Sequence, residues 1–254
     1  MKLRFQAPAL LLLLLPLAAW AMEVSMFPLP DGTEVAVRRF PAAGDRLLLW
    51  FPCDEGQGTA EAKAAAALVP QGIETWLPDM LGAHFLPMAP SSMDQLPPEE
   101  IAALIERARQ TGKRVYLVTA GRAALPLLRG LARWRGSAGS QEVEGVLLFY
   151  PELYAGTPAP GAEARYEPVV HETVARIVIL QGARSPGRWW LNHLVQAFQA
   201  AGSQVHGALL PGVRGYFFLR EEQTPEEAAM AARLPELVRE ALDRIDAMKK
   251  ENRP

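Results

Sequence analysis

Four short apolar runs that do not alternate with polar residues constrain this fold more than any other feature. They are 47–51 (LLLWF), 115–118 (VYLV), 146–150 (VLLFY) and 177–180 (IVIL). A strand with one face in water alternates apolar and polar side chains, so a continuous apolar run indicates a strand buried on both faces. Weaker runs follow the same pattern at 75–77 and 205–210. These runs predict a mostly parallel sheet with helices on both faces.

Segments with helical character separate the runs, and a hairpin precedes them. Helices are expected near 59–69, 99–109, 123–134, 189–200 and 224–250, the last broken at Pro235. Alternating apolar positions flank the turn sequence Pro30-Asp31-Gly32, which is typical of a β-hairpin. Strand–helix–strand alternation after a hairpin predicts an α/β protein with a doubly wound, mostly parallel sheet.

Residues 1–21 have the pattern of a secretory signal peptide. Lys2 and Arg4 precede an apolar run, and Ala19-Trp20-Ala21 forms an A-x-A cleavage site. The uninterrupted apolar stretch is shorter than the roughly 20 residues that span a bilayer. No Cys lies directly after this apolar stretch, which disfavours a lipoprotein. No later apolar run is long enough to span a bilayer, which disfavours a membrane span. We expect cleavage after Ala21, a single domain over 22–254, and a periplasmic or secreted protein.

Charge and composition exclude several functions. The chain has 26 basic and 28 acidic residues, for a net charge of −2, and the charges are interspersed. Without a basic stripe nothing supplies the phosphate contacts that dominate nucleic-acid binding, so no nucleic-acid partner is expected. Cys53 is the only cysteine, which excludes an internal disulfide. The four histidines are scattered without metal-ligand spacing, so no metal and no cofactor are expected.

Four loop motifs lie at predicted strand ends, in an order that resembles the α/β-hydrolase superfamily. Residues 50–56 (WFPCDEG) resemble the oxyanion loop after the third strand, and 77–82 (LPDMLG) the Asp-x-x-Gly turn after the fourth. Residues 118–123 (VTAGRA) occupy the strand-to-helix elbow, and 210–217 (LPGVRGYF) are similar to the segment that carries the catalytic histidine. The resemblance covers nearly all of residues 23–250 and implies an α/β-hydrolase-like fold.

The residues that the resemblance places at the catalytic triad positions lack the triad's chemistry. The family elbow is G-x-S-x-G, but here Gly121 stands at the nucleophile position. The acid usually follows the seventh strand, where 181–186 (QGARSP) offer Ser185 and no carboxylate, and the histidine position falls on Gly215. Because the triad members act as a unit, this pattern predicts that triad catalysis is lost.

Other residues are candidates for a relocated catalytic site. Cys53 follows the third strand, and as a nucleophile it would need a nearby base or cation; the alternative is a small buried hydrophobe. His84 follows the Asp79 turn, in which the carboxylate is expected to brace its own loop. His171 lies in the long segment 151–174, which is either a lid over a cleft or a surface excursion.

Arg122 gives the elbow a second interpretation. It would open a helix, whose free N–H groups and dipole attract anions. Gly121, Arg122, Cys53 and Asp54 are therefore the predicted ligand-binding residues, unless Arg122 only faces solvent. Thr119 is expected to hydrogen-bond local backbone rather than to act as a nucleophile.

These observations lead to three alternative functions. The first is an exported α/β-hydrolase-like protein that lacks triad catalysis and acts as an accessory protein of the envelope, binding a small molecule or another protein. The second is an active ester or acyl hydrolase with relocated catalytic residues. The third is an interaction module of an envelope complex, which predicts an exposed apolar patch larger than a few hundred Å².

Overall fold

The computed structural model describes residues 22–53, 58–138, 142–156 and 162–251. The predicted signal peptide and Asp54, one of the predicted ligand-binding residues, lie outside the described residues. Within the described part of the chain, no helix is both long and apolar enough to cross a membrane.

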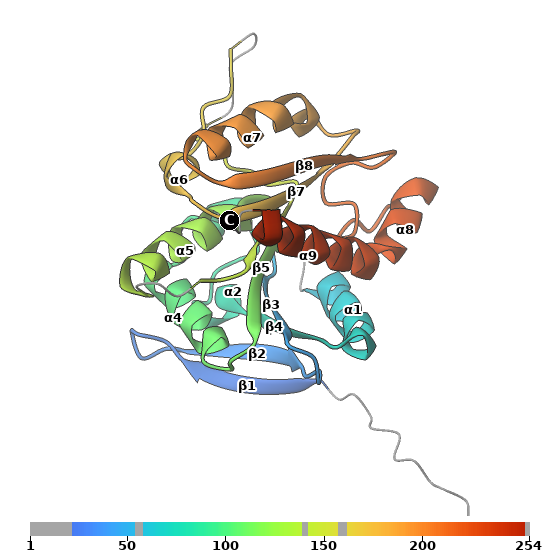
Figure 1. Cartoon of the computed structure of the whole chain (residues 1–254). Coiled ribbons are helices and arrows are strands. Elements are labelled where there is room, and N and C mark those ends of the chain that lie inside the picture. The colour runs from blue at the N-terminus through green and yellow to red at the C-terminus, as the bar shows by residue number, and fades with distance from the viewer. Residues whose placement is uncertain (1–21, 54–57, 139–141, 157–161, 252–254) are drawn as a thin grey trace, which may run out of the picture.

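An eight-stranded sheet runs through the molecule in the order β1-β2-β4-β3-β5-β6-β7-β8 (Figure 1). β1 pairs with β2 and β2 with β4 in antiparallel fashion, and every other neighbouring pair is parallel. The strands are β1 (Glu23–Pro28), β2 (Glu34–Phe40), β3 (Arg46–Phe51), β4 (Ile73–Pro78), β5 (Arg114–Ala120), β6 (Gly145–Phe149), β7 (Arg176–Gly182) and β8 (Gln204–Leu210).

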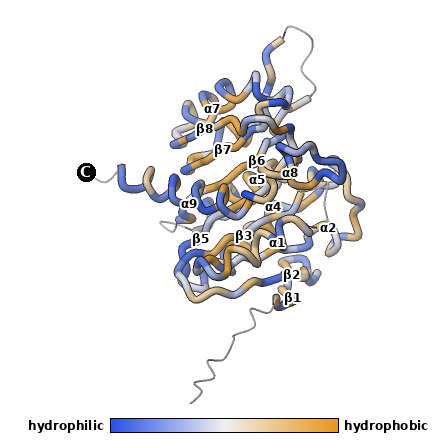
Figure 2. Tube along the Cα trace, turned by 90° about the vertical axis from the view of Figure 1, so that its right-hand side faces the viewer, coloured by the Kyte–Doolittle hydropathy of each residue, from blue (hydrophilic) through white to orange (hydrophobic). Residues whose placement is uncertain are grey.

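The continuous apolar runs form the central strands, which confirms the predicted mostly parallel α/β sheet. β6 is buried throughout its length, and β3, β5 and β7 are buried at every position except the first. The weaker runs are also strands: β4 is buried, whereas β8 at the sheet edge is mostly half-exposed. Figure 2 shows the apolar residues concentrated along these strands.

The predicted hairpin joins β1 and β2. At its turn Asp31 accepts a hydrogen bond of 2.8 Å from the backbone N–H of Thr33, and Gly32 adopts the left-handed conformation with φ 91°. Glycine reaches this conformation without the steric cost that a β-carbon brings, so the Asp-Gly pair sets the turn.

Helices cover both faces of the sheet (Figure 1). One face carries α1 (Thr59–Leu68) and α9 (Leu234–Glu251), and the other carries α4 (Pro98–Arg109), α5 (Ala124–Ala138), α6 (Pro168–Glu172) and α7 (Leu191–Ala200). α8 (Pro225–Ala232) begins with the capping box of Thr224 and Glu227. The shorter helices are η1 (Val69–Gln71), α2 (Met80–Ala83), α3 (Pro90–Met93), η2 (Gly121–Ala123) and η3 (Pro186–Trp190).

Ionic contacts from α9 hold the amino-terminal ends of the central strands. Asp246 accepts hydrogen bonds from Tyr116 Oη at 2.6 Å and from Arg46 Nη2 at 2.8 Å, and it also contacts Arg114. Arg46 and Arg114 are the first residues of β3 and β5, and Tyr116 is the third residue of β5. Because this end of the sheet is closed by structural contacts, the loops at the opposite, carboxyl ends of the strands are the ones free to form a site.

Candidate functional site

The carboxyl ends of the parallel strands bring five loops together at one edge of the sheet. They follow β3, β4, β5, β6 and β7, and the loop after β8 closes the edge. In open α/β sheets, ligands bind in the crevice outside these strand ends. Any site of this protein is therefore expected among these loops.

The turn after β5 is sharp and centred on a glycine. Gly121 has φ 57°, is buried, and begins the short helix η2 that leads into α5. A β-carbon built on Gly121 would overlap the ring and the hydroxyl oxygen of Tyr216. The space beside this turn is thus filled from the loop after β8.

Tyr216 is held over the turn by the loop after β6. Its hydroxyl donates a 2.8 Å hydrogen bond to Glu152 Oε1, and the backbone N–H of Glu152 donates to the carbonyl oxygen of Gly121 at 3.0 Å. The rings of Tyr216 and Tyr150 lie 4.7 Å apart. Both tyrosines have positive φ, at 59° and 36°, a strained conformation that persists only where surrounding contacts impose it.

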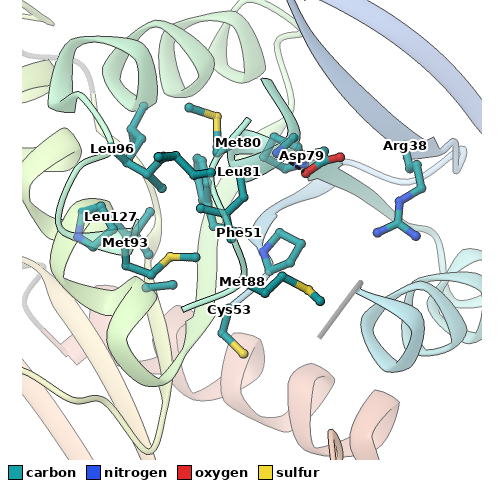
Figure 3. Close-up of a pocket in the computed structure, with 17 residues that line it drawn as sticks. Arg38, Phe51, Cys53, Asp79, Met80, Leu81, Met88, Met93, Leu96 and Leu127 are labelled. Atoms are coloured by element: carbon teal, nitrogen blue, oxygen red, sulfur yellow. Dashed lines mark hydrogen bonds between the residues drawn. The ribbon is translucent and has the colours of Figure 1, made fainter. Parts of the chain in front are cut away.

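An apolar cavity of about 420 Å³ lies beside the turn, between the ends of β3 and β4 and the helices α2 to α5 (Figure 3). We call it the apolar cavity. Methionine, leucine and other apolar side chains form most of its wall, including Phe51, Met80, Leu81, Met88, Met93 and Leu127. Its polar groups are few: Arg38, Asp79 and the thiol of Cys53. Cavities of this size and character bind small apolar ligands in many proteins.

Comparison with known proteins agrees with this architecture. No family model matches the sequence, and no curated protein matches it. Solved structures resemble it over most of its length. Carboxyl esterase 2 from the fungus Tuber melanosporum has a TM-score of 0.63 at 12% identity, covering 89% of this chain and 87% of that chain. A hormone-sensitive lipase from a metagenome library gives 0.60 at 15% identity, over 88% and 87%.

A third solved structure, the esterase of Pyrobaculum calidifontis, has a TM-score of 0.61 at 11% identity and covers 86% of each chain. The chain has the α/β-hydrolase fold. In this fold the turn after β5 is the nucleophile elbow, and here that turn is the one centred on Gly121.

The loops after β7 and β8 contact each other through a hydrogen bond. The backbone N–H of Gly215 donates to the hydroxyl of Ser185. These are the two positions at which the resemblance in the sequence leads us to expect the catalytic histidine and acid.

Arg122 is bound within the protein rather than facing solvent. Its Nε lies 2.7 Å from Asp94 Oδ1 and its Nη2 3.2 Å from Glu167 Oε1. Its Nη1 also donates to the carbonyl oxygen of Tyr154 at 3.1 Å. The hydrogen bond with Asp94 raises the pKa of Arg122. This arginine joins α3 and α6 to the elbow, so its guanidinium is already occupied by two carboxylates.

The structure places the predicted site residues in different surroundings. Cys53 is buried and lines the apolar cavity. Asp79 accepts a 2.9 Å hydrogen bond from the backbone N–H of Gly82 and caps α2, as predicted for a bracing carboxylate. Thr119 donates to the carbonyl oxygen of Phe51 at 2.9 Å, so it bonds to backbone as predicted, but to the neighbouring strand β3 rather than to local backbone.

The two histidine candidates lie apart from the elbow. His84 Nε2 lies 2.6 Å from the buried carboxylate of Glu100, and Asp31 offers a third ligand atom within 4.8 Å of both. These three residues could hold a metal ion, although Asp31 already accepts hydrogen bonds from Thr33. His171 lies at the exposed end of α6, so part of the predicted loop 151–174 is helical.

Sequence reasoning missed Tyr216 and Glu152. Tyr216 follows the expected histidine position by one residue, and Glu152 follows β6 rather than β7. For Tyr216 the only signal was its place next to Gly215, and for Glu152 there was no signal in the sequence. Their contact with Gly121 depends on how three loops meet, which no local pattern records.

Proposed function

We propose that this protein is an exported α/β-hydrolase-like binding protein that holds a small apolar molecule in the apolar cavity and carries out no triad catalysis. Export rests on the signal-like residues 1–21. The remaining parts of the proposal rest on the elbow and on the cavity beside it.

One observation carries the loss of catalysis: Tyr216 occupies the space in which a nucleophile at residue 121 would stand. Glycine has no atom that can attack a carbonyl carbon, and a substituted residue would meet the tyrosine ring. The hydrogen bond of Tyr216 to Glu152 holds the ring in place. The site is therefore altered both in the nucleophile itself and in the space around it.

The apolar cavity supports a binding role. Its wall is dominated by flexible, polarisable methionine side chains and by leucine, which adapt to varied apolar ligands. Arg38 and Asp79 place charged groups at its edge (Figure 3). Such a wall favours a ligand with an apolar body and few polar groups.

The alternative is an active hydrolase that uses Cys53. Its thiol lies in the cavity wall, where a substrate would reach it. An attacking thiolate requires a base within hydrogen-bond distance or a nearby cation that lowers the pKa of the thiol. His84 is hydrogen-bonded to Glu100, and His171 lies on α6. Neither histidine is among the described residues that line the apolar cavity.

Ester turnover separates these two functions. The protein purified from cells expressing the full chain is assayed with p-nitrophenyl esters of short and medium chain length. We expect no turnover above that of the heat-inactivated protein. Turnover that disappears in Cys53→Ala, His84→Ala or His171→Ala would show that the alternative is correct and the proposal wrong.

Ligand binding is tested with N-phenyl-1-naphthylamine, a neutral apolar fluorophore. Leu81→Trp replaces a leucine side chain of the cavity wall with the larger indole ring, which fills part of the cavity and is expected to weaken binding at least tenfold. Leu209→Trp makes the same change at an exposed position of β8 and should leave binding unchanged. Equal affinity in both variants would contradict binding in this cavity.

Export is tested by mass spectrometry of the protein from envelope and extracellular fractions. The proposal expects a chain that begins at Met22. A chain that retains residues 1–21 in these fractions would contradict cleavage after Ala21.

A further inference from the structure

A second cavity opens at the same edge of the sheet, on the side of Tyr216 formed by the loops after β6, β7 and β8. It measures about 350 Å³, and we call it the polar cavity. Its wall includes Tyr150, Tyr154, Gln181, Arg184, Ser185 and Arg220. It shares no lining residue with the apolar cavity, and its chemistry is different.

Gln181 provides a buried polar group that faces the polar cavity. It is near the end of β7 and only 6% exposed. None of the hydrogen bonds among the described residues reaches its carboxamide, although the group can both donate and accept. A β-carbon on Gly187 would lie 3.1 Å from Gln181 Nε2, so a glycine at this position keeps the amide uncovered. The residue as a whole is buried, but its amide atoms reach the polar cavity, where a ligand can donate to them and accept from them.

Two arginines give the rim of the polar cavity a positive charge. Arg184 lies in the loop after β7 and Arg220 in the loop after β8. Arg220 donates through Nε to the carbonyl oxygen of Gly215 at 3.1 Å, which orients its guanidinium while its terminal nitrogens stay outside that bond. The third arginine of the wall, Arg214, is neutralised by Glu227, with Nε and Oε1 2.6 Å apart.

The remaining polar groups complete an oxyanion-binding arrangement. Ser185 accepts a hydrogen bond from the N–H of Gly215, so its own hydroxyl proton can be donated to a ligand. Among the wall residues that the structure describes, Glu152 is the one carboxylate, and its Oε1 accepts a hydrogen bond from the Tyr216 hydroxyl. The aromatic rings of Tyr150 and Tyr154 offer an apolar surface for the rest of a ligand.

We propose that the polar cavity binds a small organic anion, whose oxyanion head is held by Gln181, Ser185, Arg184 and Arg220 and whose apolar body lies against the tyrosines. Guanidinium and amide N–H groups bind carboxylates and phosphates through charge-assisted hydrogen bonds. This site goes beyond the proposed function, because it does not depend on whether the apolar cavity is occupied.

The probes are benzoate, phenyl phosphate and inorganic phosphate, each titrated calorimetrically into the protein purified from cells expressing the full chain. Sodium chloride at matched ionic strength is the control for general screening. We expect benzoate or phenyl phosphate to bind more tightly than inorganic phosphate, which lacks an apolar body. Comparison of benzoate with phenyl phosphate shows which oxyanion head is preferred. If none of the three binds more than chloride does, the proposal is wrong.

Variants locate the binding. Gln181→Leu and Arg184→Gln are each expected to weaken anion binding at least tenfold. Arg188→Gln is the matched control, because Arg188 lies four residues further along the same connection, in η3, and donates to the carbonyl oxygen of Ala183 but does not line the polar cavity. If Gln181→Leu does not fold, the Arg184→Gln variant decides the result, because Arg184 is exposed. Anion binding that Arg184→Gln leaves unchanged would overturn the proposal.

Binding of N-phenyl-1-naphthylamine to Arg184→Gln keeps the two proposals separate. This variant should bind the neutral fluorophore as the unaltered protein does, since Arg184 is outside the apolar cavity. Loss of anion binding alone therefore reports on the polar cavity, and loss of fluorophore binding in Leu81→Trp reports on the apolar cavity.

Discussion

Gly121→Ser is expected to destabilise the protein by about 2–5 kcal/mol, because two costs combine at this position. The first is conformational: at φ 57° a residue with a β-carbon loses about 1–2 kcal/mol relative to glycine. The second is steric, since the new side chain overlaps the ring of Tyr216. Overpacking of this kind costs about 1–3 kcal/mol.

Gly112→Ser isolates the conformational cost. Gly112 has φ 75°, and a β-carbon there would meet no atom within 4 Å. Its substitution should therefore cost about 1–2 kcal/mol, without a steric contribution. Urea unfolding followed by circular dichroism gives the free energy of unfolding of both variants.

Tyr216→Ala tests the steric cost directly. In a double-mutant cycle, removal of the ring should relieve about 1–3 kcal/mol of the Gly121→Ser penalty. Two results would refute the reasoning: equal destabilisation by Gly121→Ser and Gly112→Ser, or additive effects of Gly121→Ser and Tyr216→Ala. Either would mean that Tyr216 does not fill the nucleophile space in solution.

Two further predictions concern the contacts that hold the loops. Hydrogen bonds from Arg214 lower the pKa of Glu227 from 4.5 to about 2, so its stabilising contribution is complete above pH 4.5 and is lost as the pH falls towards 2. The stability difference between the unaltered protein and Glu227→Gln should therefore shrink across this pH range in thermal denaturation; a constant difference would contradict it. Arg122→Gln should cost about 1–3 kcal/mol because it leaves Asp94 without its guanidinium and Glu167 with only that of Arg129. Arg129→Gln removes only one half-exposed ion pair with Glu167 and should cost less than about 1 kcal/mol, and equal losses in urea unfolding would be the contrary result.

The mostly parallel sheet and its hairpin could be predicted from the sequence because burial on both faces leaves a local pattern, whereas the order of the strands was not predicted. The runs that form β3, β5, β6 and β7 contain few polar residues, and the Asp31-Gly32 turn determines the hairpin. The capping box of Thr224 and Glu227 joins residues three positions apart, so its sequence signature is local as well.

The site could be predicted only in part. Gly121 was expected at the turn after β5 and lies there, and Asp79 has the predicted backbone contact in its own loop, whereas Thr119 bonds to the backbone of the neighbouring strand. The position of Tyr216 over Gly121 joins residues 95 positions apart through loop packing. The bonds of Arg122 to Asp94 and Glu167 join residues 28 and 45 positions apart, which is also beyond any local pattern.

The proposal that the elbow has no activated nucleophile is tested most directly by covalent labelling. The protein is incubated with an alkyl fluorophosphonate, which modifies serines activated by a neighbouring base, and its mass is measured. The structure predicts an unmodified mass, because Gly121 has no hydroxyl and Ser185 is hydrogen-bonded to a backbone N–H. A stoichiometric adduct on any serine of the strand-end loops would contradict the central claim.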